Sequence, residues 1–235
     1  MNVTVVYESM FGNTRRIAER IAQGIRTPLA GRPHRVIVRH VSAVTVEEAA
    51  RADVLVVGAP THANGLPRPT TRAEAARWAA DPVADLSLEA PALGAGVGEW
   101  LEALPSGDGL FATFDTRADL ARRLSGFASR GIAERLEATG RLSVLEPTSF
   151  MVTTTSHPEA QELARASTWG EMIAHAVTAA ERLALSESAA HDADDDDVDR
   201  LAGFGAGGVA AFAPDVSAEA GEGVDGGLLT PRPIG

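Results

Sequence analysis

The sequence predicts an α/β fold: a three-layer sandwich in which helices cover both faces of a five-stranded parallel sheet of order 2-1-3-4-5. Segments with strand and helix periodicity alternate five times along the chain, as in a parallel sheet joined by helical crossovers. The strand candidate at residues 53–58 is apolar on both faces, which is typical of a central strand covered by helices. Polar loops directly follow the first and third strand candidates, so both should lie at the carboxyl edge of the sheet.

The first half of the chain supplies three strands and two helices. Residues 2–7 form a short Val-rich strand that ends at the polar loop 8–13. A helix follows from Thr14, with Ile17, Ile21 and Ile25 spaced four residues apart on one face. A second strand is expected at residues 34–41, a short helix at 45–51 and the third strand at 53–58.

The second half is more broken but keeps the alternation. Residues 60–69 contain three Pro and one Gly, so regular structure is not expected there. Helices are expected at 70–80, 98–104, 125–139 and 159–185, the last with an apolar stripe through Leu163, Trp169 and Ile173. Strands are expected at 110–114 and at 142–153, the latter interrupted near Pro147.

The pattern ends at Ser186, which divides the chain into a folded domain, residues 1–186, and a tail, residues 187–235. The tail has 2 Arg against 11 acidic residues, is rich in Gly and Ala, and includes the acidic run 194–197. It has no sustained apolar periodicity, so we expect it to be disordered.

Composition excludes several classes of chemistry. All 21 basic residues are Arg, so Schiff-base chemistry and Lys-dependent phosphate loops are excluded. The absence of Cys excludes disulfides, iron–sulfur clusters and thiolate sites, and the six His show no metal-binding spacing, so no metal is expected. The net charge of −11 argues against nucleic-acid binding. With no signal peptide or long apolar run, we expect a cytoplasmic protein without a membrane anchor.

Two loops could bind a ligand together. Residues 8–14, Glu-Ser-Met-Phe-Gly-Asn-Thr, combine hydroxyls, an amide and a Gly at the start of a helix, where backbone N–H groups attract a phosphate. Residues 58–65, Gly-Ala-Pro-Thr-His-Ala-Asn-Gly, follow the third strand. In the order 2-1-3-4-5 these loops flank one crevice, and flavodoxin, which binds FMN at this switch point, is the standard example of that order.

The run from Val5 to Thr14 resembles the phosphate loop of flavodoxins, a strand followed by Ser/Thr-x-Thr/aromatic-Gly-x-Thr. The second loop is similar to the flavin-contacting loop of flavodoxins and of flavodiiron proteins. The segment 114–117, Phe-Asp-Thr-Arg, looks like a feature of short bacterial flavodoxin-domain proteins, and the resemblance implies that it forms the third loop of the site. The resemblance covers roughly residues 1–184 and implies a flavodoxin-like domain that binds FMN.

The resemblance implies a role for each loop. Ser9, Gly12, Asn13 and Thr14 would hold the FMN phosphate, and the second loop would contact the isoalloxazine ring. The full set of expected cofactor-binding residues is Ser9, Met10, Phe11, Gly12, Asn13, Thr14, Pro60, Thr61, His62, Ala63, Asn64, Gly65, Phe114, Asp115, Thr116 and Arg117.

The aromatic pair that encloses the flavin in flavodoxins is missing from these loops. The chain's Tyr is Tyr7 in the first strand, and its Trp residues are at positions 78, 100 and 169. We therefore expect one face of the flavin to be covered by Phe114, by His62 or by neither.

The resemblance predicts an electron-transfer flavoprotein in which FMN carries out the redox chemistry and no side chain has to act as a catalyst. Two alternatives remain: an NAD(P)H:quinone-type flavin reductase, and a cofactor-free flavodoxin-like module for protein interaction. Redox partner proteins are not identified by the sequence.

Overall fold

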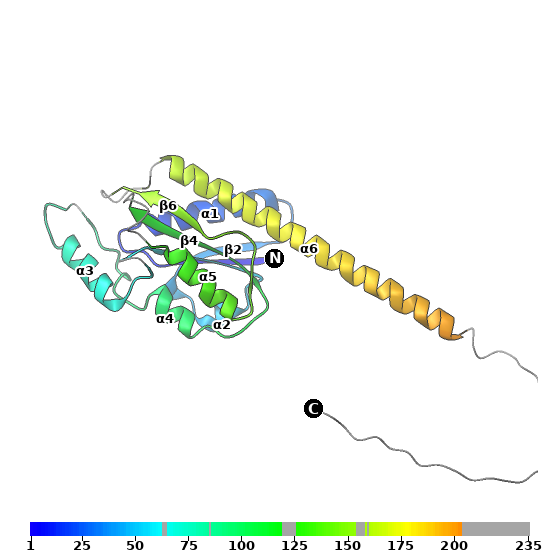
Figure 1. Cartoon of the computed structure of the whole chain (residues 1–235). Helices are drawn as coiled ribbons and strands as arrows, with labels where there is room; N and C mark the ends of the chain where they lie inside the picture. The colour runs from blue at the N-terminus through cyan, green and yellow to red at the C-terminus, as the bar shows by residue number, and fades with distance from the viewer. Residues whose placement is uncertain (63–64, 85, 119–125, 154–157, 159, 204–235) are drawn as a thin grey trace, which may run out of the picture. The chain divides into compact units, whose positions relative to one another are not determined.

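The computed structural model describes residues 1–62, 65–84, 86–118, 126–153, 158 and 160–203. The chain divides into two compact units, Met1–Glu187 and Ser188–Gly235. The first unit contains the sheet and most of the helices (Figure 1). The division between a domain ending at residue 186 and a separate tail stays a prediction.

Within the described residues, six strands form one parallel sheet: β1 (Asn2–Tyr7), β2 (Arg35–His40), β3 (Val54–Pro60), β4 (Leu110–Ala118), β5 (Leu142–Ser143) and β6 (Thr148–Val152). The order is β2-β1-β3-β4-β5, and β6 also pairs with β4. The predicted fold class and the order 2-1-3-4-5 are therefore confirmed.

The fifth predicted strand is divided into β5 and β6. β5 pairs with the start of β4, and β6 pairs with its end, from Phe114 to Ala118. Pro147 lies between them and has no N–H for the ladder, so the interruption falls where the sequence indicates it.

β4 is longer than the sequence predicts. The strand was expected to end at Phe114, but it continues to Ala118 because β3 pairs with it as far as Thr116 and β6 as far as Ala118. The expected third loop, residues 114–117, is therefore strand, and the prediction of a loop there is wrong.

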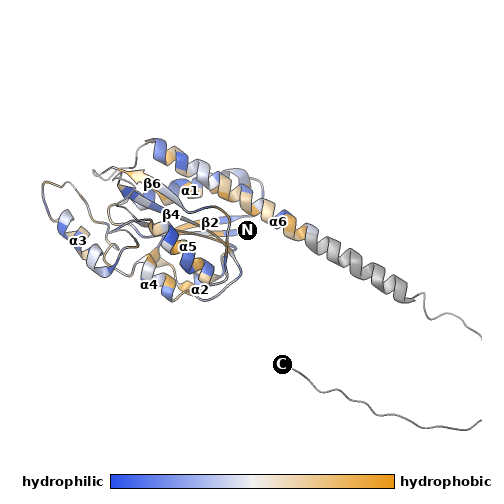
Figure 2. Cartoon of the chain, in the orientation of Figure 1, coloured by the Kyte–Doolittle hydropathy of each residue, from blue (hydrophilic) through white to orange (hydrophobic). Residues whose placement is uncertain are grey.

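The helices are α1 (Asn13–Leu29), α2 (Val46–Ala50), α3 (Pro69–Ala79), α4 (Val97–Glu102), α5 (Ala128–Ala138) and α6 (Ala160–Gly203), with a 3₁₀ turn, η1, at Val41–Ala43. Hydrophilic and hydrophobic residues alternate along α5 (Figure 2), as expected for a helix with one face in water. α6 continues to Gly203, so the expectation of disorder from residue 187 does not describe residues 187–203. That segment lacks Gly and Pro before Gly203 and contains several Ala, which favours helix.

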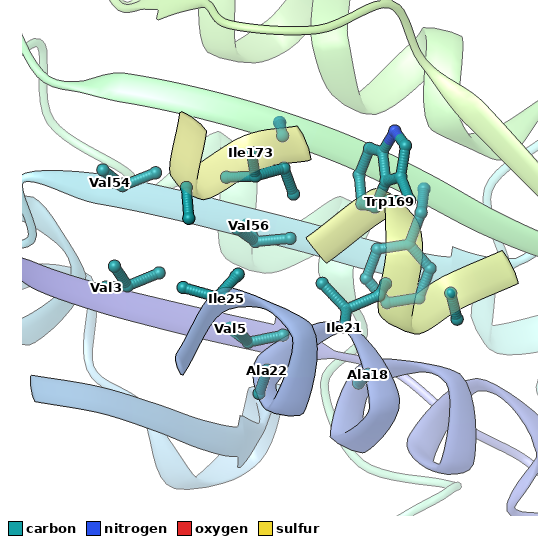
Figure 3. Packing of buried hydrophobic residues seen from close by; sticks show 14 of the residues in the cluster. Val3, Val5, Ala18, Ile21, Ala22, Ile25, Val54, Val56, Trp169 and Ile173 are labelled. Atoms are coloured by element: carbon teal, nitrogen blue, oxygen red, sulfur yellow. The ribbon is translucent and has the colours of Figure 1, made fainter. Parts of the chain in front are cut away.

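Successive strand residues point to opposite faces and so belong to different cores. Val3 and Val5 of β1, with Val54 and Val56 of β3, pack under α1 and α6. Figure 3 shows this core with Ile21 and Ile25 of α1 and Trp169 and Ile173 of α6. The other core contains Val6, Leu55 and Val57 with residues of α4 and α5. Fully burying one such aliphatic side chain contributes roughly 1.5–3 kcal/mol.

α1 and α6 approach each other closely at two glycines. A Cβ atom on Gly170 would lie 2.1 Å from the carbonyl oxygen of Ile21, and one on Gly24 would lie 1.9 Å from that of Ser167. No side chain fits at either position, so this contact depends on glycine.

Candidate functional site

A cavity of about 330 Å³ lies at the carboxyl ends of β1, β3 and β4. Its walls come from both predicted loops and from four further segments: Ser9, Met10, Phe11, Asn13, Thr14, Pro60, Thr61, His62, Trp78, Leu86, Thr116, Arg117, Ala118, Val152 and Thr153. This is where parallel α/β sheets bind ligands, and the volume falls at the lower end of the range for small-molecule sites.

The first loop folds around Ser9 and Gly12. The Ser9 Oγ accepts a hydrogen bond from the Gly12 N–H at 3.0 Å, and Gly12 has a φ of +85°, in the region that favours glycine. Gly12 precedes α1, no side chain caps the helix, and its first turn contains no acidic residue. The free N–H groups of that turn form a partially positive end suited to an anion. The charge of Arg15 in the same turn is already paired with Glu89, at 2.6 Å, and with Glu19, at 3.1 Å.

Thr14 connects this loop to β4. Its Oγ1 lies 2.7 Å from the Oγ1 of Thr116, and both residues are buried. Asn13 lies beside Thr14 in the cavity wall, and its Oδ1 is buried without a hydrogen-bond partner among the described residues. A buried acceptor without a donor is costly, so this atom is available to a donor group of a ligand.

The second loop is held by β4 and α5. The Thr61 N–H donates to the Thr116 carbonyl at 2.8 Å, and the Thr61 Oγ1 accepts from the Ala128 N–H at 3.0 Å. His62 and Gly65 exchange two backbone hydrogen bonds of 2.9 Å. Burial, and then the nearby charge of Arg72, lower the pKa of His62, so its imidazole is neutral at pH 7.

The structure brings together most of the predicted binding residues but not all of them. Gly12 and Gly65 shape the two loops without lining the cavity. Ala63 and Asn64 lie outside the described residues. Phe114 and Asp115 are both fully buried and lie away from the cavity.

The expectation that Phe114 could cover the flavin is wrong. Its ring packs in the core against Phe150 and Trp169, at centroid distances of 6.2 and 6.3 Å. The ring also lies against Gly58, where a Cβ atom would be 2.2 Å away. Residues alternate along a strand, and Phe114 points to the face covered by α1 and α6.

Asp115 does not line the cavity; it binds the start of α5 instead. Its Oδ2 accepts hydrogen bonds from the Ser129 N–H at 3.0 Å and from the Ser129 Oγ at 2.6 Å. Asp115 and Thr61 thus satisfy N–H groups in the first turn of α5, which fixes that helix beside the cavity.

Trp78 is one of five cavity residues that the sequence did not indicate. It lies near the end of α3, lines the cavity and is 53% exposed. The helix and its Trp are visible in the sequence directly after the second loop, but only the tertiary structure shows that α3 reaches the cavity. Leu86, Ala118, Val152 and Thr153 are further wall residues that the sequence did not indicate.

Arg117 provides a buried positive charge in the cavity wall. The residue is 6% exposed, and its guanidinium carbon lies 4.5 Å from the centroid of the Phe127 ring. Arg130 lies at the same distance from that ring.

Glu8 lies directly before Ser9 of the first loop and is 1% exposed. Its Oε2 accepts a hydrogen bond from the Val97 N–H at 2.8 Å, and its Oε1 lies 3.6 Å from Nη1 of Arg72. Burial raises the pKa of Glu8 to about 7, although the Val97 hydrogen bond and the Arg72 charge oppose that shift. Glu8 therefore titrates near neutral pH next to the cavity.

No described helix is both long and apolar enough to cross a membrane. No group of three or more His, Asp and Glu side chains in the described ranges is placed to hold a metal ion.

Comparisons with known proteins agree with this geometry. The family model described as Flavodoxin matches residues 5–103. A flavodoxin from the domain Archaea is 22% identical, with a TM-score of 0.52 and coverage of 76% of this chain and 99% of that chain. The flavodoxin of Streptococcus pneumoniae TIGR4 is 19% identical, with a TM-score of 0.52 and coverage of 74% and 99%.

Oxidised Flavodoxin 1 from Bacillus cereus is 18% identical, with a TM-score of 0.52 and coverage of 74% of this chain and 97% of that chain. Among curated proteins, none matches the chain. At these identities the solved structures establish the fold.

Proposed function

We propose that this chain, which has a flavodoxin-like fold and matches the flavodoxin family over residues 5–103, binds FMN in its cavity and transfers electrons. The observation that carries the proposal is the cavity itself. Both loops that the sequence analysis selected line the same cavity, at the carboxyl edge of the sheet.

The residues present fit the phosphate of FMN. The first turn of α1 has no side-chain cap, and the Ser9 hydroxyl accepts from Gly12 and retains its own hydrogen for a ligand. Thr14 adds a second hydroxyl at the helix start. These groups suit one terminal phosphate, so we propose FMN rather than FAD or a nicotinamide dinucleotide.

The remaining walls fit the rest of the molecule. Asn13 offers its unpartnered Oδ1 to a hydroxyl of the ribityl chain. Phe11, Trp78 and Val152 provide apolar surface for the isoalloxazine ring. Bound FMN would supply reversible electron-transfer chemistry, while the protein supplies orientation and electrostatics. Neutral His62 and charged Arg117 are the polar side chains placed to influence that chemistry.

The test is a titration of the purified protein with FMN, FAD and riboflavin, followed by calorimetry. We expect FMN to bind more tightly than FAD, and more tightly than riboflavin because riboflavin lacks the phosphate. A colourless protein that ignores added FMN would favour the cofactor-free interaction module instead. NAD(P)H-dependent reduction of a quinone by the loaded protein would favour the reductase alternative.

A further inference from the structure

Helix α3 has little apolar surface to hold it in place. Arg72 and Ala75 are its buried residues. Ala75 belongs to a small cluster with Met10 and Ala92. A helix that packs by the hydrophobic effect buries an apolar stripe of three to four residues per two turns. α3 lies at one end of the domain (Figure 1), and Trp78 near its end lines the cavity. With so little apolar burial, the position of this helix depends on its one buried charge.

Arg72 has contacts on two other elements. Its Nη2 donates to the Glu99 Oε1 at 2.7 Å, and its Nη1 donates to the Glu99 Oε2 at 3.3 Å, a bidentate pair with α4. Its Nη1 also lies 3.6 Å from the Glu8 Oε1, at the end of β1. The guanidinium is 4% exposed, so water competes little for these contacts.

The backbone around Arg72 is adapted to this arrangement. A Cβ atom on Gly96 would lie 2.4 Å from the Arg72 Nη1 and 2.6 Å from the Glu8 Oε2. A side chain at position 96 would displace the ends of these two charged side chains, so glycine leaves room for them to meet beside the first residues of α4.

Trp78 lies six residues after Arg72 on the same short helix and lines the cavity. The other two Trp residues, Trp100 and Trp169, are 8% and 6% exposed. Trp78 is thus the indole whose accessibility reports on the position of α3.

We infer that Arg72 is a positioning residue: its ion pairs with Glu99 and Glu8 hold α3 so that Trp78 forms a wall of the ligand cavity. The inference rests on the proposed function for the identity of the ligand, but the position of Trp78 can be measured without any ligand.

The experiment compares Arg72→Met with Arg77→Met. Arg77 is an exposed residue of α3 with no described contact to Glu8 or Glu99, so its replacement controls for loss of an arginine from this helix. In the flavin-free proteins, acrylamide should quench Trp fluorescence more strongly in Arg72→Met than in the wild type. Arg77→Met should remain at the wild-type value. Circular dichroism and a cooperative melt verify that each variant is folded.

The second measurement is flavin affinity in a double-mutant cycle with Trp78→Ala. Arg72→Met should weaken the binding of FMN and of riboflavin by the same factor, roughly 3- to 10-fold, because both ligands would lose the contact between Trp78 and the isoalloxazine ring. In the Trp78→Ala background, Arg72→Met should have little further effect. A merely structural role for Arg72 would lower affinity equally in both backgrounds.

Unchanged quenching in folded Arg72→Met, or equal effects with and without Trp78, would overturn the inference. If Arg72→Met does not fold, Glu99→Gln is the second variant. It removes the negative charge that pairs with Arg72, and the Glu99 side chain is 38% exposed, so the change is easier to accommodate. It should raise quenching in the same direction. If no variant and no wild-type protein binds a flavin, the proposed function fails, while the quenching comparison still decides the role of Arg72.

Discussion

Replacing Glu8 by Gln should stabilise the protein above neutral pH, although it removes one member of a buried ion pair. Burial raises the pKa of Glu8 from 4.5 to about 7, so the folded state holds this proton more tightly than the unfolded state. The contribution of Glu8 to stability is then fully present below pH 4.5 and is lost as the pH rises through 7. Gln is the isosteric neutral replacement, and its amide oxygen can still accept from the Val97 N–H.

The size of the effect follows from the shift. A difference of two and a half pKa units corresponds to about 3 kcal/mol of unfolding free energy. Above pH 7, Glu8→Gln should exceed the wild type by up to this amount, and near pH 4.5 the two should be equal. For a domain of this size the gain corresponds to roughly 6–12 °C in Tm.

The assay is urea unfolding of both flavin-free proteins at several values between pH 5 and 8. Burial lowers the pKa values of His40 and His62, but both residues are common to the two proteins and their contributions cancel in the difference. Glu99→Gln is a control of opposite sign. The Arg72 hydrogen bond lowers the pKa of Glu99 despite partial burial, so that variant should lose stability at neutral pH. A difference between wild type and Glu8→Gln that does not change with pH would refute the reasoning.

Three further predictions concern the ligand, the helix contact and the tail. Ser9→Ala or Thr14→Ala should weaken FMN roughly 10- to 100-fold and leave riboflavin unchanged, as titration calorimetry would show, because one hydrogen bond to a charged phosphate is lost. Equal weakening of both ligands would exclude the phosphate role. Gly170→Ala should lower the unfolding free energy by about 1–3 kcal/mol, because its Cβ would overlap the Ile21 carbonyl oxygen. An unchanged midpoint of urea unfolding would argue against the close contact between α1 and α6. Truncation after Ser186 should keep the calorimetric Tm within about 5 °C, because the sequence of the acidic tail has no sustained apolar periodicity that would add to a core. A larger drop would refute the division.

The local sequence predicted the fold and its resemblance to flavodoxins, and both are confirmed. The apolar run in β3 and the spacing of Ile17, Ile21 and Ile25 are local patterns. Each one matches the residues that its own strand or helix buries, so it can be read without knowing the rest of the fold. Both loops at the carboxyl edge of the sheet were found for the same reason. Their position follows from strand direction, which the alternation of strands and helices indicates.

The errors and omissions concern contacts between distant segments. The end of β4 is set by hydrogen bonds from β3 and β6, and this pairing turned the expected loop at 114–117 into a strand with Phe114 in the core. In a strand, alternate residues point to opposite faces of the sheet, so the orientation of residues 114–117 depends on whether the strand includes them. The sequence alone did not show that it does.

Only the tertiary structure shows that Trp78 lines the cavity and that Glu8, Arg72 and Glu99 form a charge cluster. Glu8, Arg72 and Glu99 are far apart in the sequence, and each one read singly is an ordinary surface residue. They become buried partners only when the end of β1, α3 and α4 meet, with Gly96 leaving room for both side chains. Periodicity reports which face of an element is apolar, but an ion pair between elements leaves no periodic pattern, so its geometry emerges only from the folded chain.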